Sequence, residues 1–302
     1  MISSLQLSDL VLNALETSDT SEQTALTQLT SGRRVNADSD DPAAAAQEVN
    51  ISSQMNNCDQ YLRSITSLTS ELQTADSSLN SVVTALQQAI SLGTEGANGT
   101  LSQQNCTTIA QQIKGISQQV FSVANLSYNG SYVFAGTATT QPPYVLDNSA
   151  PGGVLYQGNG DVNSVEVAQG ESVAVNQPGS QLFSSPDANV FVALDDLTTA
   201  LESNCTTDDI GDAVTQLRSA YDQLTSARTF YGSTVDQIVG TQVFLDSESV
   251  QLASQQNSTV GIDMDVAVTD LTNAEESRAA TVQAASSMNG TSLMDYLANM
   301  ER

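Results

Sequence analysis

The sequence predicts a mainly α-helical protein: a long antiparallel coiled-coil-like helical bundle, a small inserted β domain and terminal helices. Two long stretches, one in each half of the chain, repeat apolar residues in steps of three and four. Such a repeat keeps one seam of a helix turned toward a partner helix. Between them lies a stretch rich in Pro, Gly and alternating Val, which is typical of short strands.

The first long helix is expected over residues 46–92. Asp41 and Pro42 precede it and suit the N-cap and the first helical position. Thr69 and Asp76 interrupt its second stripe. Its main seam repeats every seven residues: Ile51, Cys58, Ile65, Leu72, Leu79 and Leu86. Three glycines are expected to end it: Gly93, Gly96 and Gly99.

A shorter helix is expected next, from the apolar spacing of Ile109, Ile113, Ile116, Val120 and Val123.

The amino-acid composition then changes. From Tyr132 to Pro186 the chain has no Lys or Arg and holds five of its six prolines. Four β-prone runs alternate with turn residues there: 144–146, 154–156, 162–167 and 173–175. We expect a small β domain inserted between the helical segments.

Helix is predicted again from about Val190, with Leu194, Leu197 and Leu201 on one face. Asp208 and Asp209 suit the start of a second long helix, because acidic residues stabilise the first turn. Its seam runs from Ile210 to Leu252 and includes Arg228. Antiparallel pairing of this helix with residues 46–92 would bury both seams.

The two ends carry weaker apolar stripes, and the N-terminal one is broken by Asp19 and Glu22. Neither stripe is apolar enough to form a stable helix alone, so each is expected to need a partner, in its own chain or in a neighbouring subunit. A helix pair that closes an ordinary bundle explains the periodicity equally well. The stripe residues are Leu5, Leu12, Leu15, Leu26 and Leu29 at the start, and Leu271, Ala274, Val282, Ala285, Leu293 and Leu297 at the end.

The charge excludes several classes of function. The chain has 34 acidic residues, 8 basic residues and no His, for a net charge of −26. Nucleic-acid phosphates would repel such a chain, and an anionic membrane surface would too. No apolar run approaches the roughly 20 residues of a transmembrane helix. We expect no conventional cleaved signal at the start.

Candidate chemistry is scarce. Without His, the commonest general base and transition-metal ligand is missing, and no phosphate loop or nucleophile elbow occurs. Asp38, Asp40 and Asp41, with Asp263 and Asp265, offer carboxylates for a hard cation, but they lack the Gly and distant Glu of a calcium loop. We predict no enzyme, no metal site and no cofactor.

The three cysteines, Cys58, Cys106 and Cys205, are widely spaced and form no CxxC motif. They are expected to be small apolar residues, buried or half-buried.

Residues 26–36 read Leu-Thr-Gln-Leu-Thr-Ser-Gly-Arg-Arg-Val-Asn, and residues 40–44 read Asp-Asp-Pro-Ala-Ala. They resemble the N-terminal signature shared by flagellins and the hook-associated protein 3 family. Residues 128–144, the inserted segment and the end from Ser292 to Leu297 resemble hook-associated protein 3, the family of hook–filament junction proteins. The matching positions are Gly32, Arg34, Asn36, Asp40, Asp41, Pro42, Tyr132, Phe134, Gly136, Asp295 and Tyr296.

The resemblance implies a flagellin-like division of the chain. Residues 1–45 and 262–302 would be axial helices (D0), disordered in the isolated subunit. Residues 46–131 and 190–261 would form the helical bundle (D1), and residues 132–189 the outward β domain (D2).

The resemblance also implies a structural role in the bacterial flagellum. The subunit would be exported by the flagellar type III apparatus, with a chaperone on its C-terminal helix. It would pass transiently through the cytoplasm and assemble outside the cell as a ring of copies. The ring would join hook-associated protein 1 to flagellin, with the stripe residues of both ends packed between subunits.

Two alternatives stay open at this point. A flagellin of the same superfamily would polymerise with itself into filaments. An acidic helical adhesin stalk or cation-binding protein would have a stable terminal helix pair and fold in response to Ca²⁺.

Overall fold

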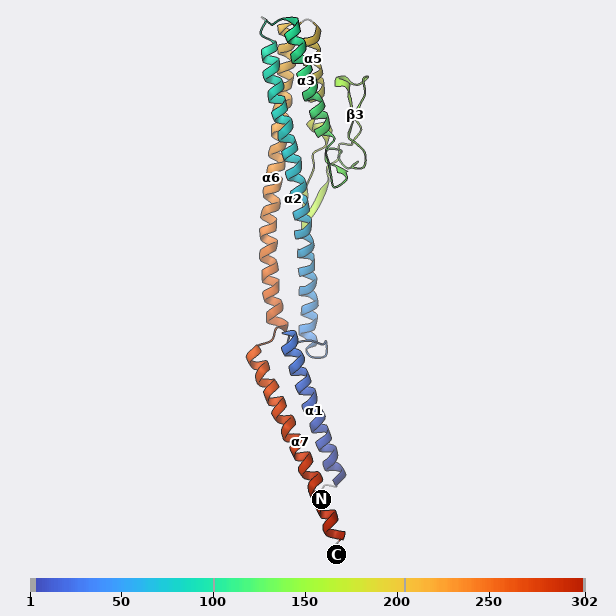
Figure 1. Ribbon diagram of the computed structural model, residues 1–302, viewed down its shortest axis with the longest axis vertical. Helices are drawn as coiled ribbons and strands as arrows, with labels where there is room; N and C mark the ends of the chain where they lie inside the picture. The colour runs from blue at the N-terminus through green and yellow to red at the C-terminus, as the bar shows by residue number, and fades with distance from the viewer. Residues whose placement is uncertain (1–3, 100, 204, 301–302) are drawn as a thin grey trace. The chain divides into compact units, whose positions relative to one another are not determined.

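The computed structural model describes the backbone of residues 4–99, 101–203 and 205–300, and the side chains of residues 9–99, 101–203 and 205–287 (Figure 1). It is mainly helical with short strands, which confirms the predicted fold class. The chain divides into two compact units. The larger unit is Cys58–Ser247, and the terminal unit holds the chain up to Asn57 and from Glu248 onward.

The larger unit is built around two long helices, α2 (Pro42–Gly96) and α6 (Thr207–Val260), which lie side by side and antiparallel (Figure 1). The Cys58 thiol donates to the carbonyl of Leu245 at 3.2 Å, and Gln87 Nε2 donates to the Tyr221 hydroxyl at 2.9 Å. Most residues of the two seams are buried, among them Ile65, Leu72, Leu79, Leu86, Leu217, Leu224, Tyr231 and Ile238. The predicted antiparallel pairing is therefore confirmed.

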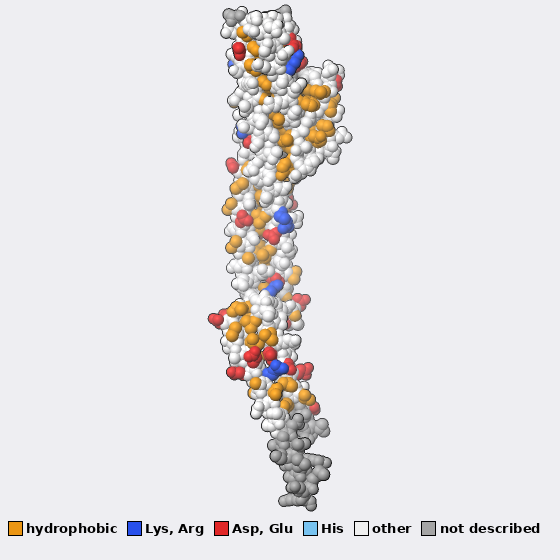
Figure 2. All heavy atoms as spheres, in the orientation of Figure 1, with side chains coloured by type: hydrophobic (Ala, Val, Ile, Leu, Met, Phe, Trp, Pro, Cys, Tyr) orange, Lys and Arg blue, Asp and Glu red, His pale blue; other side chains and the backbone are white. Residues whose placement is uncertain are grey.

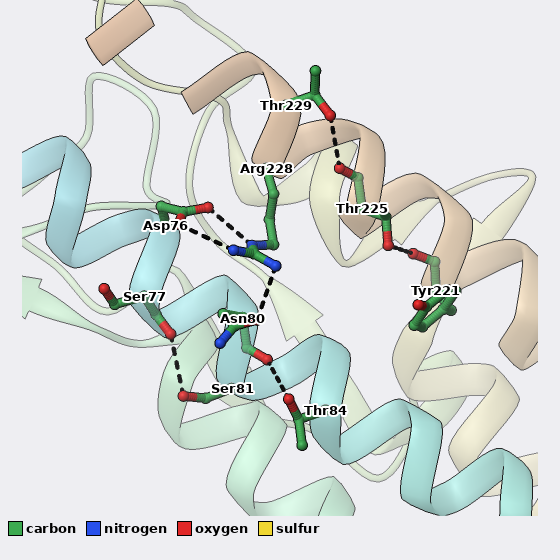
Figure 3. Close-up of polar contacts among 9 residues, drawn as sticks. All are labelled: Asp76, Ser77, Asn80, Ser81, Thr84, Tyr221, Thr225, Arg228 and Thr229. Carbon is green, nitrogen blue, oxygen red and sulfur yellow. Dashed lines mark hydrogen bonds and ion pairs between the residues drawn. The ribbon is translucent and has the colours of Figure 1, made fainter. Parts of the chain in front are cut away.

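Many Ser and Thr side chains on these helices bond to their own helix. In Figure 3, Thr84 Oγ1 donates to the carbonyl of Asn80, and Thr225 Oγ1 donates to the carbonyl of Tyr221, both at 2.9 Å. Such bonds satisfy the hydroxyl one turn back along the helix. These hydroxyl groups are therefore satisfied without a partner from another helix.

Two shorter helices, α3 (Gln103–Ala124) and α5 (Val190–Ser203), pack together and complete the helical core at one end of this unit. Gly93 does not end α2, which continues to Gly96. A Cβ on Gly93 would lie 2.6 Å from Val214 Cγ2, and one on Gly96 would lie 2.7 Å from Leu201 Cδ2. These glycines therefore allow α5 and α6 to approach α2 closely. Gly99 lies beyond the helix.

The segment between α3 and α5 contains four two-stranded antiparallel sheets. Its strands are β1 (Ser127–Tyr128), β2 (Ser131–Tyr132), β3 (Tyr144–Leu146), β4 (Val154–Tyr156), β5 (Ser164–Ala168), β6 (Glu171–Ala174), β7 (Ser184–Ser185) and β8 (Ala188–Asn189). The strands pair in twos, β1 with β2, β3 with β4, β5 with β6 and β7 with β8, so that Val145 lies opposite Leu155 and Val165 opposite Val173. The short helices η1 (Pro151–Gly153) and α4 (Gly179–Leu182) connect them. The four predicted runs coincide with β3 to β6, within a few residues.

An aromatic cluster provides the core of this β domain. The rings of Phe134 and Phe183 lie 5.4 Å apart, and that of Tyr144 lies 5.2 Å from Phe191 at the start of α5. The Tyr144 hydroxyl donates to the carbonyl of Gly179 at 2.7 Å, and burial raises its pKa. Two-stranded sheets are marginal by themselves, so these rings supply the buried area that holds them against the bundle.

Cys106 and Cys205 form a disulfide with their Cα atoms 6.2 Å apart. The expectation that all three cysteines are simple apolar residues is wrong for this pair. The fold brings the first turn of α3 beside the loop between α5 and α6, although the two cysteines are 99 positions apart in the sequence. Cys58 is buried, as expected.

The terminal unit contains α1 (Ser4–Ser31), α7 (Met264–Met300) and the adjoining ends of α2 and α6. α1 and α7 lie side by side (Figure 1). Val35, Ala44 and Val260 form a small core where the four helix ends meet. In the described parts of the chain, no helix combines the length and apolar character needed to cross a bilayer.

Candidate assembly surface

The terminal helices pack through small residues and a few polar contacts. Ala25 and Ala274 are buried. The Ser18 hydroxyl donates to the carbonyl of Ala274 at 3.3 Å. Arg278 on α7 reaches Asp19 at 2.7 Å and Glu22 at 3.3 Å on α1. The two acidic residues that interrupt the N-terminal stripe thus form ion pairs with Arg278 on the opposite helix.

The pair buries only part of the predicted stripes. Ala274 is buried, and Leu15, Leu29, Leu271 and Ala285 are half-buried. The others with described side chains face solvent: Leu12 is 60% exposed, Leu26 44% and Val282 51%. The side chains of Leu5, Leu293 and Leu297 lie outside those that the structure describes.

Further apolar residues are exposed beside them. Leu10, Val266 and Val268 are each more than half exposed. On the terminal pair, Figure 2 shows hydrophobic side chains beside acidic and basic ones. A groove of about 1290 Å³ follows the two helices, lined by residues such as Leu10, Ala14 and Thr281. Exposed apolar residues that gather on one helix pair are typical of an interaction site, whereas the groove itself is lined mainly by Ser, Thr and Asn side chains.

The signature loop joins the ends of four helices. Gly32 ends α1 in the left-handed region, with φ of +69°, which glycine adopts at no steric cost. The amide of Arg34 donates to the carbonyl of Val260 at 2.7 Å, and the amide of Ile262 donates to the carbonyl of Gly32 at 3.2 Å. The loop after α1 is thereby bonded to the chain between α6 and α7.

Two ion pairs reinforce these backbone bonds. Arg33 Nη2 lies 2.5 Å from Glu48 Oε1 on α2, and the same oxygen accepts from Gln256 Nε2 on α6 at 2.9 Å. Arg34 Nη2 contacts Asp41 and also donates to the carbonyl of Thr259, both at 3.1 Å. Each arginine therefore connects the signature loop with a long helix.

The acidic residues of the signature serve the backbone. Asp41 Oδ1 accepts from the amide of Ala44 and caps α2, as predicted for the Asp-Pro pair. Asp40 Oδ2 accepts from the amides of Asn36 and Ala37. These N–H donors lower the pKa of both carboxyl groups, with Arg34 adding to the effect at Asp41. In the described part of the chain, no group of His, Cys, Asp or Glu has a metal-binding arrangement.

The remaining signature residues lie elsewhere. Phe134 belongs to the aromatic cluster of the larger unit, and Tyr132 lies in β2. At Gly136, φ is +70° and a Cβ would overlap Asn159. The side chains of Asp295 and Tyr296 lie outside those described. The signature residues with described side chains thus lie at two separate structural positions, the loop after α1 and the entry to the β domain.

Sequence reasoning missed the residues that complete the loop network. Glu48 and Gln256 carry no motif, and Val260 and Gly261 lie where the second long helix ends. One signal was available: Glu48 lies three residues before Ile51, on the side of the helix that faces α6. A charged residue at such a position needs a partner.

The sequence and fold of this chain are similar to those of known flagellar proteins. Residues 2–139 match the family model of the bacterial flagellin N-terminal helical region. Flagellar hook-associated protein 3 of Escherichia coli strain K12 is 25% identical over 290 residues, which cover 88% of this chain and 90% of that protein. The chain is therefore similar to proteins of the flagellin superfamily, and the family model covers residues 2–139 of it.

Within the superfamily, the resemblance to hook-associated protein 3 is extensive. The protein of that name from Salmonella typhimurium is 33% identical over 190 residues, 58% of the length of each chain. A solved flagellar hook-associated protein from Vibrio parahaemolyticus shares the fold, with a TM-score of 0.68 at 22% identity, covering 74% of this chain and all of that one. Matching flagellins align over 37% to 52% of the chain. These relatives are structural proteins of the flagellum and not enzymes.

Proposed function

We propose that this protein is a structural subunit of the junction between the flagellar hook and filament. The observation that carries this proposal is the similarity to hook-associated protein 3 along nearly the whole chain, where flagellins match about half of it or less. Its place of action would be the flagellum, outside the cell.

The terminal helices would be the assembly elements. Residues 1–45 and 262–302 would act as axial helices, residues 46–131 and 190–261 as the bundle, and residues 132–189 as the outward β domain. The exposed Leu12, Leu26 and Val282 support this division, because an isolated helix pair gains nothing from apolar residues that face water. In a ring of copies, the same residues would pack between subunits.

The signature loop would transmit load between the axial helices and the bundle. Arg33, Arg34 and Glu48 connect the loop to both long helices through ion pairs and hydrogen bonds. Torque applied to α1 and α7 would therefore reach α2 and α6 through several bonds at once.

The partners would be hook-associated protein 1 on one side, flagellin on the other, and further copies of this chain. Export through the flagellar type III apparatus and a chaperone on the C-terminal helix belong to the same proposal. The subunit would pass through the cytoplasm before export, with its terminal helices disordered during passage through the export apparatus.

A motile host that lacks its own hook-associated protein 3 provides the test. We expect this chain to restore filament attachment and swimming, and to be found at the base of the filaments by immunogold labelling. Failure to restore attachment, with the chain folded and secreted, would reject the junction role.

Salting-out distinguishes the alternative of a flagellin. With ammonium sulfate, a flagellin forms long filaments by itself, whereas a junction subunit stays monomeric or forms small assemblies. Long filaments of the purified chain in electron micrographs would favour the filament role.

A further inference from the structure

The disulfide of the larger unit lies outside the surfaces that the assembly proposal uses. Cys106 is fully buried in the first turn of α3, and Cys205 is half-buried in the loop between α5 and α6. Their Cα separation of 6.2 Å is ordinary for a disulfide. Cys205 has φ of +49°, the left-handed region that residues with a side chain rarely adopt.

Two reversals of the chain meet at this point, which we call the bundle tip: the loop after Gly96 and the loop that holds Cys205. Among the described residues, few other polar links cross the bundle tip. Gln103 Nε2 donates to the carbonyls of Leu201 and Glu202 at 3.3 and 3.1 Å. Lys114 pairs with Glu202 at 2.6 Å, but both side chains are more than 40% exposed, and such pairs contribute little.

The disulfide also closes a long loop. The chain between its cysteines contains nearly all of α3, the β domain and α5, over a sequence separation of 99 residues. The β domain consists of two-stranded sheets with little strength of their own. Because a link across so long a loop strongly restricts the unfolded chain, its loss affects this whole segment.

We propose that Cys106 and Cys205 form a redox-dependent lock on the bundle tip. A chain made in a reducing cytosol begins with two thiols and a loose tip, and an oxidising exterior closes the lock. The inference stands on the disulfide and rests on the export step of the proposed function, but it does not require the junction role.

The oxidant is a small-molecule or protein disulfide. The Cys205 thiolate, the more accessible of the two, attacks it to form a mixed disulfide and releases one thiolate. The Cys106 thiolate then attacks the Cys205 sulfur, which releases the second thiolate. The two protons lost by the cysteines end on the two thiols released, so one external disulfide is reduced for each lock formed.

Thermal unfolding of the full chain tests the lock, with oxidised glutathione and a phosphine reductant as the two conditions. We expect the oxidised chain to have two fewer reactive thiols after denaturation than the reduced chain. Reduction should lower the melting temperature of the larger unit by about 10 °C. It should also accelerate hydrogen exchange at least tenfold in the first turns of α3 and the last turn of α5.

Cysteine variants localise the effect. The double variant C106S/C205S should behave like the reduced chain under both conditions, and the control C58S should keep the full response to reductant. With oxidised glutathione, C106S should retain glutathione on Cys205, seen as an increase in mass, whereas C205S should not. Equal thiol counts in both conditions, or equal melting temperatures, would overturn the proposal, and both are measured on the unmutated chain.

Discussion

Asp76 of α2 and Arg228 of α6 form a two-bond ion pair across the larger unit (Figure 3). Arg228 Nε lies 2.9 Å from Asp76 Oδ1, and Nη2 lies 3.2 Å from Oδ2. The third nitrogen, Nη1, donates to Asn80 Oδ1 at 2.8 Å. Each of these charged residues interrupts an apolar stripe of its own helix, and the antiparallel pairing places the two interruptions opposite each other.

This pair should contribute to stability and to the register of the two helices. Its side chains are 32% and 34% exposed, so solvent screening limits the gain. We expect a coupling free energy of about 1 kcal/mol from a double-mutant cycle of Asp76→Ala and Arg228→Ala in urea unfolding. The more exposed Lys114–Glu202 pair is the matched control and should give a few tenths of that value. Additive effects at Asp76 and Arg228 would show that the pair contributes no specific energy.

The Asp76–Arg228 pair shows what the sequence could predict and what it could not. Periodicity locates both helices and both polar breaks, and aligning Asp76 with Arg228 would have fixed the antiparallel register. No comparable signal identifies the disulfide, because the spacing of Cys106 and Cys205 contains no information about their proximity. The pairing depends on how α3 and α5 fold back along the long helices.

The functional surface was predictable only in part. The stripe residues were identified from spacing, but spacing does not tell which of them the chain covers itself. Ala25 and Ala274 are buried because small residues allow two helices to approach closely, whereas Leu12 and Val282 exceed what two helices can bury. Glu48 was missed because its importance arises from Arg33 and Gln256, which reach it from distant parts of the chain.

Gly32 should be needed for its backbone conformation alone. Its φ is +69°, and a Cβ there would meet nothing within 4 Å. Gly32→Ala should therefore cost about 1 kcal/mol through the left-handed conformation, with Gly32→Asn costing less. Gly115 also has open space around it but lies inside α3, so Gly115→Ala should stabilise the chain by about 0.5–1 kcal/mol. Thermal unfolding of the variants measures both effects. Equal shifts at both positions would contradict the conformational explanation.

Glu48 should hold the signature loop to the long helices. Glu48→Ala leaves Arg33 and Gln256 without their shared acceptor, at a cost of about 1–3 kcal/mol in the terminal unit. The amides of Arg34 and Ile262, which bridge the loop to the end of α6, should exchange faster with solvent. Asp59→Ala, an exposed change on the same helix, is the control. Unchanged protection of both amides in Glu48→Ala would show that the backbone bonds suffice without Glu48.

Acid should loosen the start of α2. Hydrogen bonds from Ala44 to Asp41, and from Ala37 and Asn36 to Asp40, hold the pKa of each carboxyl below its ordinary value of 3.8. A carboxyl with a lowered pKa stabilises the fold above its unfolded pKa, and this contribution is lost as the pH falls through the lower folded value. Amide protection of Ala44 should therefore decrease below about pH 4.

One variant checks the sign of this acid effect. Asp41→Asn removes the titrating group, so the protection of Ala44 should no longer change with pH in that range.

Burial raises the pKa of Glu71 above 4.5, so its ionised form opposes folding and the penalty to stability grows as the pH rises through the folded pKa. Glu71→Gln should therefore raise the melting temperature at pH 7 and leave it nearly unchanged at pH 3. Destabilisation by Glu71→Gln at pH 7 would contradict the burial argument.

Exposed and buried stripe positions should separate assembly from folding. Leu12→Asp and Val282→Asp place a charge where the isolated chain already meets water, so unfolding of the monomer should change by less than about 0.5 kcal/mol. The same charges would be buried without a partner between packed subunits, which costs several kcal/mol for each contact. Filament attachment in the complementation assay should therefore be lost while circular dichroism stays unchanged. Ala274→Asp, a change at a buried position, should instead separate α1 from α7 in the monomer. If Leu12→Asp and Val282→Asp assemble normally, the outward faces of the terminal helices are not the subunit contacts, and the junction must be built from another surface of the chain.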